Sequence, residues 1–327
     1  MTIFNSRSAR PYLLLAAITL VLAIVDGDRG RFLNHATAFS VLQQFATIGP
    51  VALGLGLSMI IREFDLSVGG MLSLAGCVAV MTGASDPALG VALAVAIGVL
   101  SGVTQGAIMV RLLLSSVGVT LGGLLTVGGL AYVLTANQTI GYPRMDIALM
   151  VNEPVLGVLS LRSTVAIAAV FAAAAIMAWT RIGRDVIAVG SDRRAALVAG
   201  VNVDRIVIGV FAVSGMLSAF AGALLSYSLA AASPVALVDA LVPATAAAII
   251  GGVSLSGGKG TPLGIAGGVL VLALLRSGLT AIGVPPYAHD IVTGAVLLAV
   301  AMIDAPDLYR RLFTLRRALN QRDRIAD

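Results

Sequence analysis

Residues 251–261 form the stretch of the chain that comes closest to a chemical motif, and they read GGVSLSGGKGT. A phosphate-binding loop requires Gly, four residues and then Gly-Lys-Ser/Thr, because its backbone amides and lysine hold phosphates and its hydroxyl holds a metal ion. Here Val253 stands where the first glycine is required, and Gly260 stands where the hydroxyl is required. We therefore expect that this chain does not itself hydrolyse a nucleotide.

Other reactive side chains are few and scattered. The chain has one cysteine, Cys77, which excludes a disulfide framework and a cysteine-based metal site. His35 and His289 are isolated and have no metal-ligand partners at helical spacing. Neither a Ser/His/Asp arrangement nor a catalytic pair of acids stands out. The sequence thus predicts no catalytic, cofactor-binding or metal-binding residue.

The composition indicates what kind of scaffold carries these residues. Of 327 residues, 58% are hydrophobic and only 11% are charged, and the mean hydropathy is +1.01. Soluble domains carry about 25% charged residues, so an ordinary soluble enzyme is excluded. Disorder is excluded as well, because it requires low hydrophobicity. The apolar runs are continuous rather than alternating, which argues against a transmembrane β-barrel. We predict an all-α, polytopic membrane protein.

Ten apolar segments approach the roughly 20 residues that a membrane-spanning helix needs. They lie near residues 11–25, 41–61, 67–84, 88–110, 112–135, 163–180, 206–229, 239–252, 261–281 and 289–303. The first, eighth and tenth are short, and each could extend into its flank, tilt or fail to span fully. The glycine-rich stretches near 41–61 and 251–268 are expected to hold broken helices, which membranes tolerate only where protein or water lines the backbone.

The basic residues predict the orientation of these spans, because cytosolic segments are enriched in Arg and Lys. With the N-terminus inside and ten spans, sixteen basic residues lie inside, four lie outside, and Arg276 falls within a span. Both termini are therefore expected in the cytosol, which also explains the net charge of +5 without nucleic acid. The prediction is one membrane domain over 1–327. It has a cytosolic N-terminus (1–10), a periplasmic loop (136–162), a cytosolic coupling loop (181–205) and a cytosolic basic tail (304–327).

A turn with two acids, Glu63 and Asp65, separates the second and third predicted spans. One interpretation is a short solvated turn in which Ser67 is the N-cap of the next helix. The other is a helix break that lines or supports a pathway, because a charge at membrane depth normally faces water or a partner. The residues assigned to this pathway or helix-break role are Asp65, Ser67, Gly69, Gly251, Gly252, Gly257 and Gly258.

Residues 183–200 predict a short helix inside the 181–205 loop. Asp192 is a candidate N-cap. A small-residue face would be formed by Ala195, Ala196 and Ala199, and Gly200 would end the helix or make a close contact. Such a helix could dock into a groove of another protein. The alternative is a plain loop whose arginines only follow the positive-inside rule.

These blocks together resemble the membrane (permease) subunit of bacterial ATP-binding cassette (ABC) importers for monosaccharides, of the ribose, xylose and galactose type. The resemblance rests on DLSVG at 65–69, on Gly183-Arg184 with the alanines and glycine through Gly200, and on GGVSLSGG at 251–258 followed by Gly260-Thr261. There are two departures. Arg62-Glu63-Phe64 stands where such chains often have Gly-Gly-Ile. Arg194 replaces the Glu of a Glu-Ala-Ala…Gly coupling signature.

The resemblance implies a transport subunit rather than an enzyme, in the bacterial inner membrane. It implies a homodimer with the pathway between its subunits, a periplasmic sugar-binding protein outside, and a separate ATPase inside that uses the ATP. Arg194, Ala195, Ala196 and Gly200 would then couple to the ATPase. Alternatives remain open: a permease for a polyol, inositol, nucleoside or branched-chain amino acid, or an ion-coupled secondary transporter. Mid-helix acids would favour the last, and none of the 16 acids sits clearly there.

Overall fold

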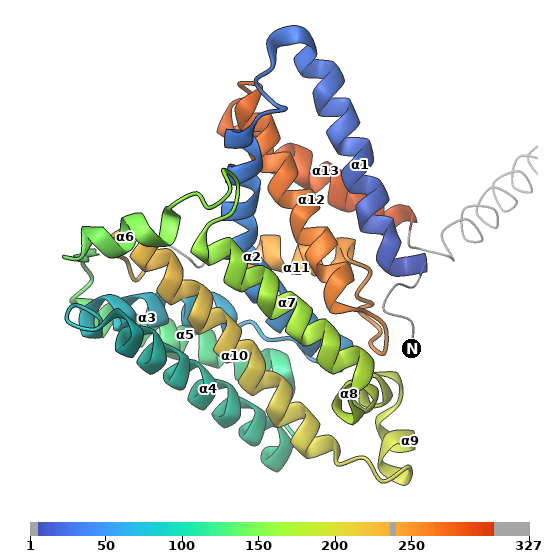
Figure 1. Cartoon of the computed structure of the whole chain (residues 1–327). Helices are drawn as coiled ribbons and strands as arrows, with labels where there is room; N and C mark the ends of the chain where they lie inside the picture. The colour runs from blue at the N-terminus through green and yellow to red at the C-terminus, as the bar shows by residue number, and fades with distance from the viewer. Residues whose placement is uncertain (1–5, 236–239, 304–327) are drawn as a thin grey trace, which may run out of the picture. The chain divides into compact units, whose positions relative to one another are not determined.

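The computed structural model describes residues 6–235 and 240–303. The chain divides into two compact units, residues 1–283 and 284–327. Within the described residues, helices dominate and the only sheet is a pair of two-residue strands. The predicted all-α class is confirmed, and Figure 1 shows the helices in chain order.

The elements follow one another with short connections. The first unit contains α1 (Ser6–Asp26), η1 (Gly27–Arg29), α2 (His35–Ile60), α3 (Val68–Thr82), α4 (Pro87–Leu112), α5 (Ser116–Thr135), β1 (Ile140–Gly141), α6 (Met145–Asn152), α7 (Leu161–Trp179), α8 (Arg181–Ser191), α9 (Arg193–Val198), α10 (Val203–Ser228), β2 (Ala231–Ala232), α11 (Leu241–Ile250) and α12 (Pro262–Ala281). The described part of the second unit contains α13 (Pro286–Ile303). The strands β1 and β2 pair antiparallel, with Ile140 opposite Ala232.

Each of the ten predicted apolar segments coincides with a helix. Seven described helices are long and apolar enough to cross a membrane: α1, α2, α4, α5, α7, α10 and α12. Helices α3 and α11 are shorter apolar helices of 15 and 10 residues. The chain is therefore a polytopic α-helical membrane protein, and the total of ten spans stays a prediction.

The prediction that the stretch near 41–61 is a broken helix was wrong. Helix α2 continues from His35 to Ile60 with Pro50 inside it, and the chain breaks only after Ile60. Its glycines serve packing instead. A Cβ on Gly54 would lie 2.8 Å from Ser214 Cα of α10, and a Cβ on Gly56 would lie 2.5 Å from Ile265 Cδ1 of α12. Small residues of this kind let membrane helices approach closely. The 251–268 stretch does contain a break, between α11 and α12.

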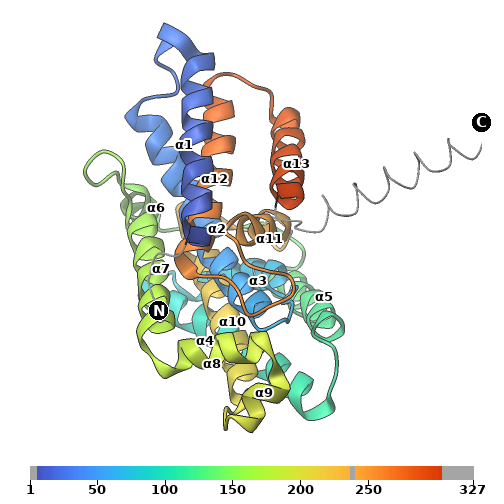
Figure 2. The same ribbon diagram turned by 90° about the vertical axis from the view of Figure 1, so that its right-hand side faces the viewer.

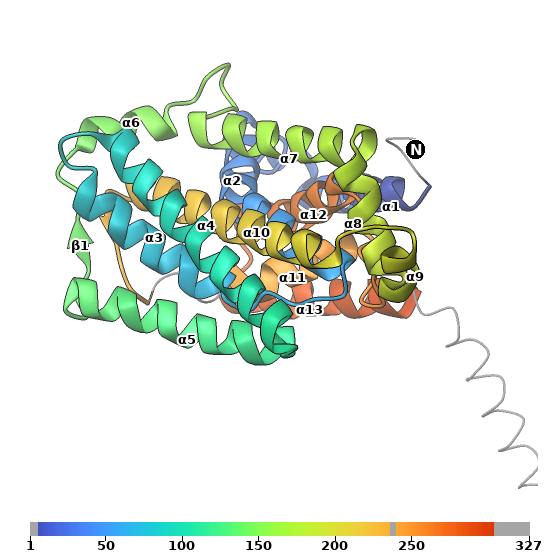
Figure 3. The same cartoon turned by 90° about the horizontal axis from the view of Figure 1, so that it is seen from below.

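Helix α10 packs against α4 along most of its length, as Figures 1 and 3 both show. The contact is between backbones. A Cβ on Gly98 would lie 2.4 Å from Gly215 O, a Cβ on Gly215 would lie 2.1 Å from Gly98 O, and a Cβ on Gly102 would lie 2.1 Å from Phe211 O. These glycines therefore fix the distance between the two helices. Helices α2 and α3 also pack on α10, so this helix is the centre of the first unit.

Helix α6 and the α8–α9 pair lie at opposite ends of this helix packing (Figure 1). At the α6 end, the rings of Tyr142 and Tyr227 stack with centroids 4.6 Å apart. Tyr142 Oη donates to Gly83 O at 2.9 Å, and Tyr227 Oη donates to Ala79 O at 3.1 Å. The loop predicted over 136–162 thus contains a strand and a helix that are fastened to the spans.

A buried arginine lies at the same end. Arg162, at the start of α7, is only 5% exposed. Its Nη1 donates to Ser228 Oγ at 2.6 Å and its Nη2 donates to Thr47 Oγ1 at 2.7 Å. Ser228 Oγ donates to Asn152 Oδ1 of α6 at 2.8 Å. One guanidinium therefore links α7 to α10 and α2 directly, and to α6 through Ser228.

Candidate functional site

The three sequence blocks that we singled out meet at the α8–α9 end of the first unit. Gly258 N donates to Ile60 O, the last carbonyl of α2, at 2.8 Å. A Cβ on Gly190 of α8 would lie 1.9 Å from the same Ile60 O and 2.7 Å from Gly258 N. Arg62 Nη2 donates to Ser191 O at 2.6 Å. Figure 2 shows α8 and α9 beneath α2, α3 and the turn that enters α12. Residues far apart in the sequence thus form one site.

The break between α2 and α3 is a tight turn at residues 61–67. Arg62 adopts φ of +64°, a left-handed conformation that is uncommon for a residue other than glycine. Glu63 N donates to Ser58 O at 2.9 Å. Phe64 N donates to Ser116 Oγ at 3.2 Å, and Phe64 O accepts from Thr120 Oγ1 at 3.0 Å. The turn is therefore tied both to the end of α2 and to the start of α5.

Asp65 is the buried acid of this turn, with 1% of its surface exposed. Its Oδ1 accepts from Ser67 N at 3.0 Å and from Ser67 Oγ at 2.6 Å. Gln105 Nε2 of α4 donates to Ser67 Oγ at 3.1 Å. Burial raises the pKa of the Asp65 carboxyl, and the hydrogen bonds from Ser67 oppose that shift. Asp65 thus anchors the start of α3 and reaches α4 through Ser67.

Ser67 does not act as the predicted N-cap. It immediately precedes α3, but its backbone is already helical and its side chain makes no capping hydrogen bond. The Ser67 hydroxyl instead donates a hydrogen bond to Asp65 Oδ1. Gly69 lies buried in the first turn of α3. Beside it, a Cβ on Gly70 would lie 2.8 Å from Leu124 O, so α3 and α5 touch at this level.

The predicted coupling loop, residues 181–205, contains two helices, α8 and α9. Asp192 is the N-cap of α9, as predicted, because its Oδ1 accepts from Arg194 N at 2.8 Å and from Ala195 N at 3.1 Å. The hydrogen bonds from the Ala195 and Arg194 amides lower the pKa of the Asp192 carboxyl. Gly200, with φ of +84°, follows α9 and lets the chain reverse there.

The surface of α9 differs from the small-residue face that we expected. Ala196 is buried, whereas Arg194, Ala195 and Gly200 are exposed. Two larger apolar residues are exposed beside them, Leu197 at 58% and Val198 at 91%. Sequence reasoning missed both, although an apolar pair directly after the alanines is visible in the sequence. It also missed α8 as a helix, despite buried Gly183, Val186 and Gly190 at helical spacing.

The glycine block forms the turn between α11 and α12. Gly251 packs against the start of α12, where its Cβ would lie 2.5 Å from Gly264 O. Gly252, Gly257 and Gly258 all have positive φ angles. Gly257 and Gly258 also lie against other segments, since a Cβ on Gly257 would meet Arg62 Cγ at 2.1 Å and a Cβ on Gly258 would meet Ser191 Oγ at 2.5 Å. At Gly257 and Gly258, only glycine both adopts a positive φ angle without strain and leaves room for the neighbouring atoms.

Two successive residues, Arg62 and Glu63, connect the α2–α3 turn to the α8–α9 junction. Glu63 Oε1 forms an ion pair with Arg193 Nη2, and the two side chains are 12% and 43% exposed. A pair at the water boundary contributes about 0.2–1 kcal/mol. The left-handed backbone at Arg62 costs on the order of 1–3 kcal/mol, which its surroundings must offset.

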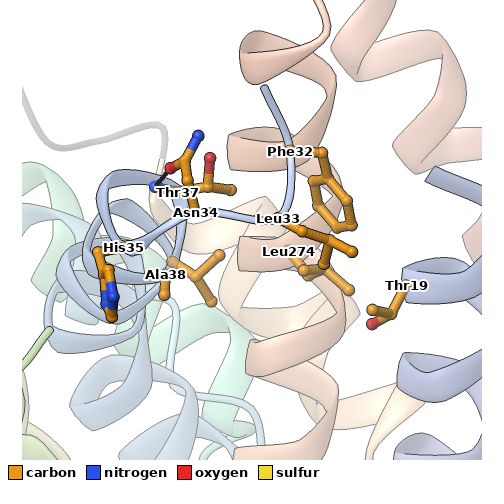
Figure 4. A pocket seen from close by; sticks show the side chains of 9 residues that line it. Thr19, Phe32, Leu33, Asn34, His35, Thr37, Ala38 and Leu274 are labelled. Atoms are coloured by element: carbon orange, nitrogen blue, oxygen red, sulfur yellow. Dashed lines mark hydrogen bonds between the residues drawn. The ribbon is translucent and has the colours of Figure 1, made fainter. Parts of the chain in front are cut away.

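Two cavities lie away from this junction. One, of 380 Å³, lies between α1, α2 and α12, where Phe32, Leu33, Ala38 and Leu274 supply an apolar lining (Figure 4). Asn34 Oδ1 beside it is engaged by Thr37 N at 2.8 Å. The other, of 660 Å³, lies between α3, α4 and α5, and its lining combines apolar residues with the polar residues Ser101, Thr104, Gln105, Ser115 and Thr126. Gln105 Oε1 is buried without a hydrogen-bond partner among the described residues.

Comparison with known proteins gives a consistent set of relatives. The chain matches the family described as "Branched-chain amino acid transport system / permease component" over residues 37–301. It is 30% identical over 303 residues to the ribose import permease protein RbsC of Bacillus subtilis, a match that covers 90% of this chain and 91% of that protein. It is 29% identical over 314 residues to the fructose import permease protein FrcC of Rhizobium meliloti, covering 92% and 86%. No solved structure matches the chain.

Proposed function

Since the chain belongs to the family of branched-chain amino acid transport system permease components, we propose that it forms the membrane pathway through which an ABC importer takes up a monosaccharide. The chain is a multi-pass inner-membrane transport subunit. The observation that carries the choice of solute is its 30% identity, over nine-tenths of its length, to proteins named ribose import permeases. Relatives named for fructose and L-arabinose import support the same class.

The geometry supports a subunit that couples to a partner rather than one that catalyses a reaction. Helix α9 exposes Leu197 and Val198 between Arg194 and Gly200, which is the mixture of apolar and basic groups that a protein groove takes. We assign docking on the ATPase to Arg194, Ala195, Ala196 and Gly200. ATP hydrolysis in that partner would shift the permease between two states for which its ligands differ in affinity.

The pathway residues follow from the same arrangement. We assign support of the helix break to Asp65, Ser67 and Gly69, and to the four glycines of the facing turn, Gly251, Gly252, Gly257 and Gly258. Neutral sugars need hydrogen-bond partners and little fixed charge, which suits spans that carry small and polar residues. A second copy of this chain would complete the pathway, and a periplasmic sugar-binding protein would deliver the solute.

The proposed topology has ten spans and one domain over 1–327. Residues 1–10, 181–205 and 304–327 would face the cytosol, and 136–162 would face the periplasm. The last of these segments contains β1 and α6, which fasten it to the spans at the end opposite α8–α9. A periplasmic segment that is held in place in this way would present a fixed surface on which a binding protein can dock.

Transport by the purified complex tests the proposal. The tagged chain is isolated from its own host's membranes with the proteins that accompany it, and placed in proteoliposomes with radiolabelled ribose, fructose, L-arabinose, inositol or leucine. We expect uptake of a sugar that requires ATP and both partners. Uptake of leucine or inositol alone would assign another solute class. Ion-driven uptake by this chain without an ATPase would make it a secondary transporter.

A further inference from the structure

Glu63 and Arg193 belong to two different sequence blocks, and the proposed function uses neither. Glu63 lies in the α2–α3 turn, two residues before Asp65, and Arg193 is the first residue of α9. Their side chains form one of the ion pairs of the described chain, and it is the one that joins these two blocks.

The neighbouring contacts all bear on the same junction. Arg62 Nη2 donates to Ser191 O at 2.6 Å and so holds the last carbonyl of α8. Glu63 forms the ion pair with Arg193, the first residue of α9. Gly258, which lies against Ser191, donates from its N to Ile60 O at 2.8 Å. The α8–α9 junction is thus attached to the turn by two side chains of opposite charge that are adjacent in the sequence.

A continuous series of contacts runs from this junction into the membrane part. Glu63 N donates to Ser58 O in α2, and Phe64 contacts Ser116 and Thr120 in α5. Asp65 then binds Ser67, which Gln105 of α4 also binds. A displacement of α9 that pulls on Glu63 would therefore reach α2, α3, α4 and α5 through bonded neighbours.

We infer that Glu63 and Arg193 form a charge latch that positions α9 against the α2–α3 turn, so that movement of the docked helix is passed to the turn that holds Asp65. This inference rests on the proposed function. Both residues are positioning residues, because neither lines a cavity described above. The latch lies at the water boundary, with Arg193 43% exposed. Water weakens such a pair, and this lets it open and close again in a transport cycle.

Charge reversal and charge exchange test the latch in the assembled importer. The variants are Glu63→Arg, Arg193→Glu and the double exchange, with Glu63→Gln as a neutral variant of similar shape. The readout is the number of ATP molecules hydrolysed for each solute molecule transported. We expect each reversal to raise this ratio by about threefold or more and the exchange to return it to within about twofold of wild type, as coupled neighbours do in a double-mutant cycle.

Arg205→Glu is the matched control, because Arg205 is exposed at the start of α10, near the same junction in sequence, and takes the same change of charge. It should leave the ratio unchanged. Reversals that behave like this control would overturn the latch, as would an exchange that fails to rescue at wild-type membrane abundance. A wild-type complex without ATP-dependent uptake would instead reject the proposed function, so the two failures are distinguishable.

Discussion

The amide of Gly258 donates a hydrogen bond of 2.8 Å to the carbonyl oxygen of Ile60, and this bond fastens the α11–α12 turn to the last turn of α2. Gly190 of α8 lies against the same two atoms. Three segments that are distant in the sequence thus share one contact, which makes the contact sensitive to the volume of a single methyl group.

Gly190→Ala should destabilise the protein. The added Cβ would lie 1.9 Å from Ile60 O, and backbone atoms cannot move aside as a flexible side chain can. Overpacking of this kind costs about 1–3 kcal/mol. Gly209→Ala is the control, because Gly209 is also helical and has no atom within 4 Å of its Cβ position. Thermal unfolding in detergent should show a lower midpoint for the first variant only. Equal midpoints would contradict the close contact.

Asp65→Asn should be mild and Asp65→Leu severe. Asparagine keeps an oxygen that can accept from Ser67 N and Ser67 Oγ, whereas leucine leaves both buried donors without that acceptor. Uptake of radiolabelled sugar is measured in cells carrying the complete system, with membrane abundance checked by immunoblot. Full uptake by the leucine variant at normal abundance would remove Asp65 from the proposed role.

Arg162→Lys should lower stability more than Arg162→Met does. Lysine keeps the cost of burying a charge but cannot bridge Ser228 and Thr47 with two nitrogens, so it loses a charge-assisted hydrogen bond of about 1.5–3 kcal/mol. Methionine removes the buried charge altogether, which is often tolerated in a well-packed site. The order of the two unfolding midpoints is the measurement. A lysine variant as stable as wild type would show that charge alone suffices.

Gly200→Trp should weaken coupling while Gly200→Asn preserves it. The φ angle of +84° at Gly200 disfavours tryptophan, whereas asparagine visits this region more readily. The space around Gly200 is open, so backbone strain and not a clash separates the two variants. The readout is ATP hydrolysis stimulated by solute-loaded binding protein in the assembled importer. Equal stimulation in both variants would indicate that the end of α9 is not critical for docking.

Cysteine labelling tests the topology, and the chain offers a clean background because its single cysteine, Cys77, is buried. A cysteine at Glu153, which is exposed in the proposed periplasmic segment, should react with an impermeant reagent in intact cells. A cysteine at Arg194 should react only after the membrane is opened. The reverse pattern would invert the orientation, and reaction of both in intact cells would reject the ten-span arrangement.

Some local features of the fold could be predicted from the sequence, although the N-cap at Ser67 was not among them, and the long-range contacts could not be predicted. The hydrogen bonds that Asp192 and Asp65 accept come from neighbours two or three residues away, so these roles can be predicted from the local sequence. The contacts of Gly54 and Gly56 depend on α10 and α12. For that reason a glycine-rich run suggested a broken helix where the structure has an intact one.

The pairing of Glu63 with Arg193 could not be predicted from the sequence either, because it also depends on segments that are distant in the chain. An acid in a short turn and an arginine in a basic loop each have a plain solvated interpretation. The packing of Gly190 against Ile60 at the end of α2, and of Gly257 against Arg62, brings the two segments that carry these charges together. Helix α6 was missed because eight residues within a polar loop give a weak periodic signal.

The position of Arg162 has a consequence for biosynthesis. The chain is made from its N-terminus, so Thr47 in α2 is already present when α7 enters the membrane, but Ser228 at the end of α10 has not yet been synthesised. In the proposed orientation this arginine must also cross the bilayer, against the usual bias of basic residues. Arg162 can therefore make both hydrogen bonds only after α10 has been synthesised, and truncation of the nascent chain before residue 228 should leave α7 without its bond to α10.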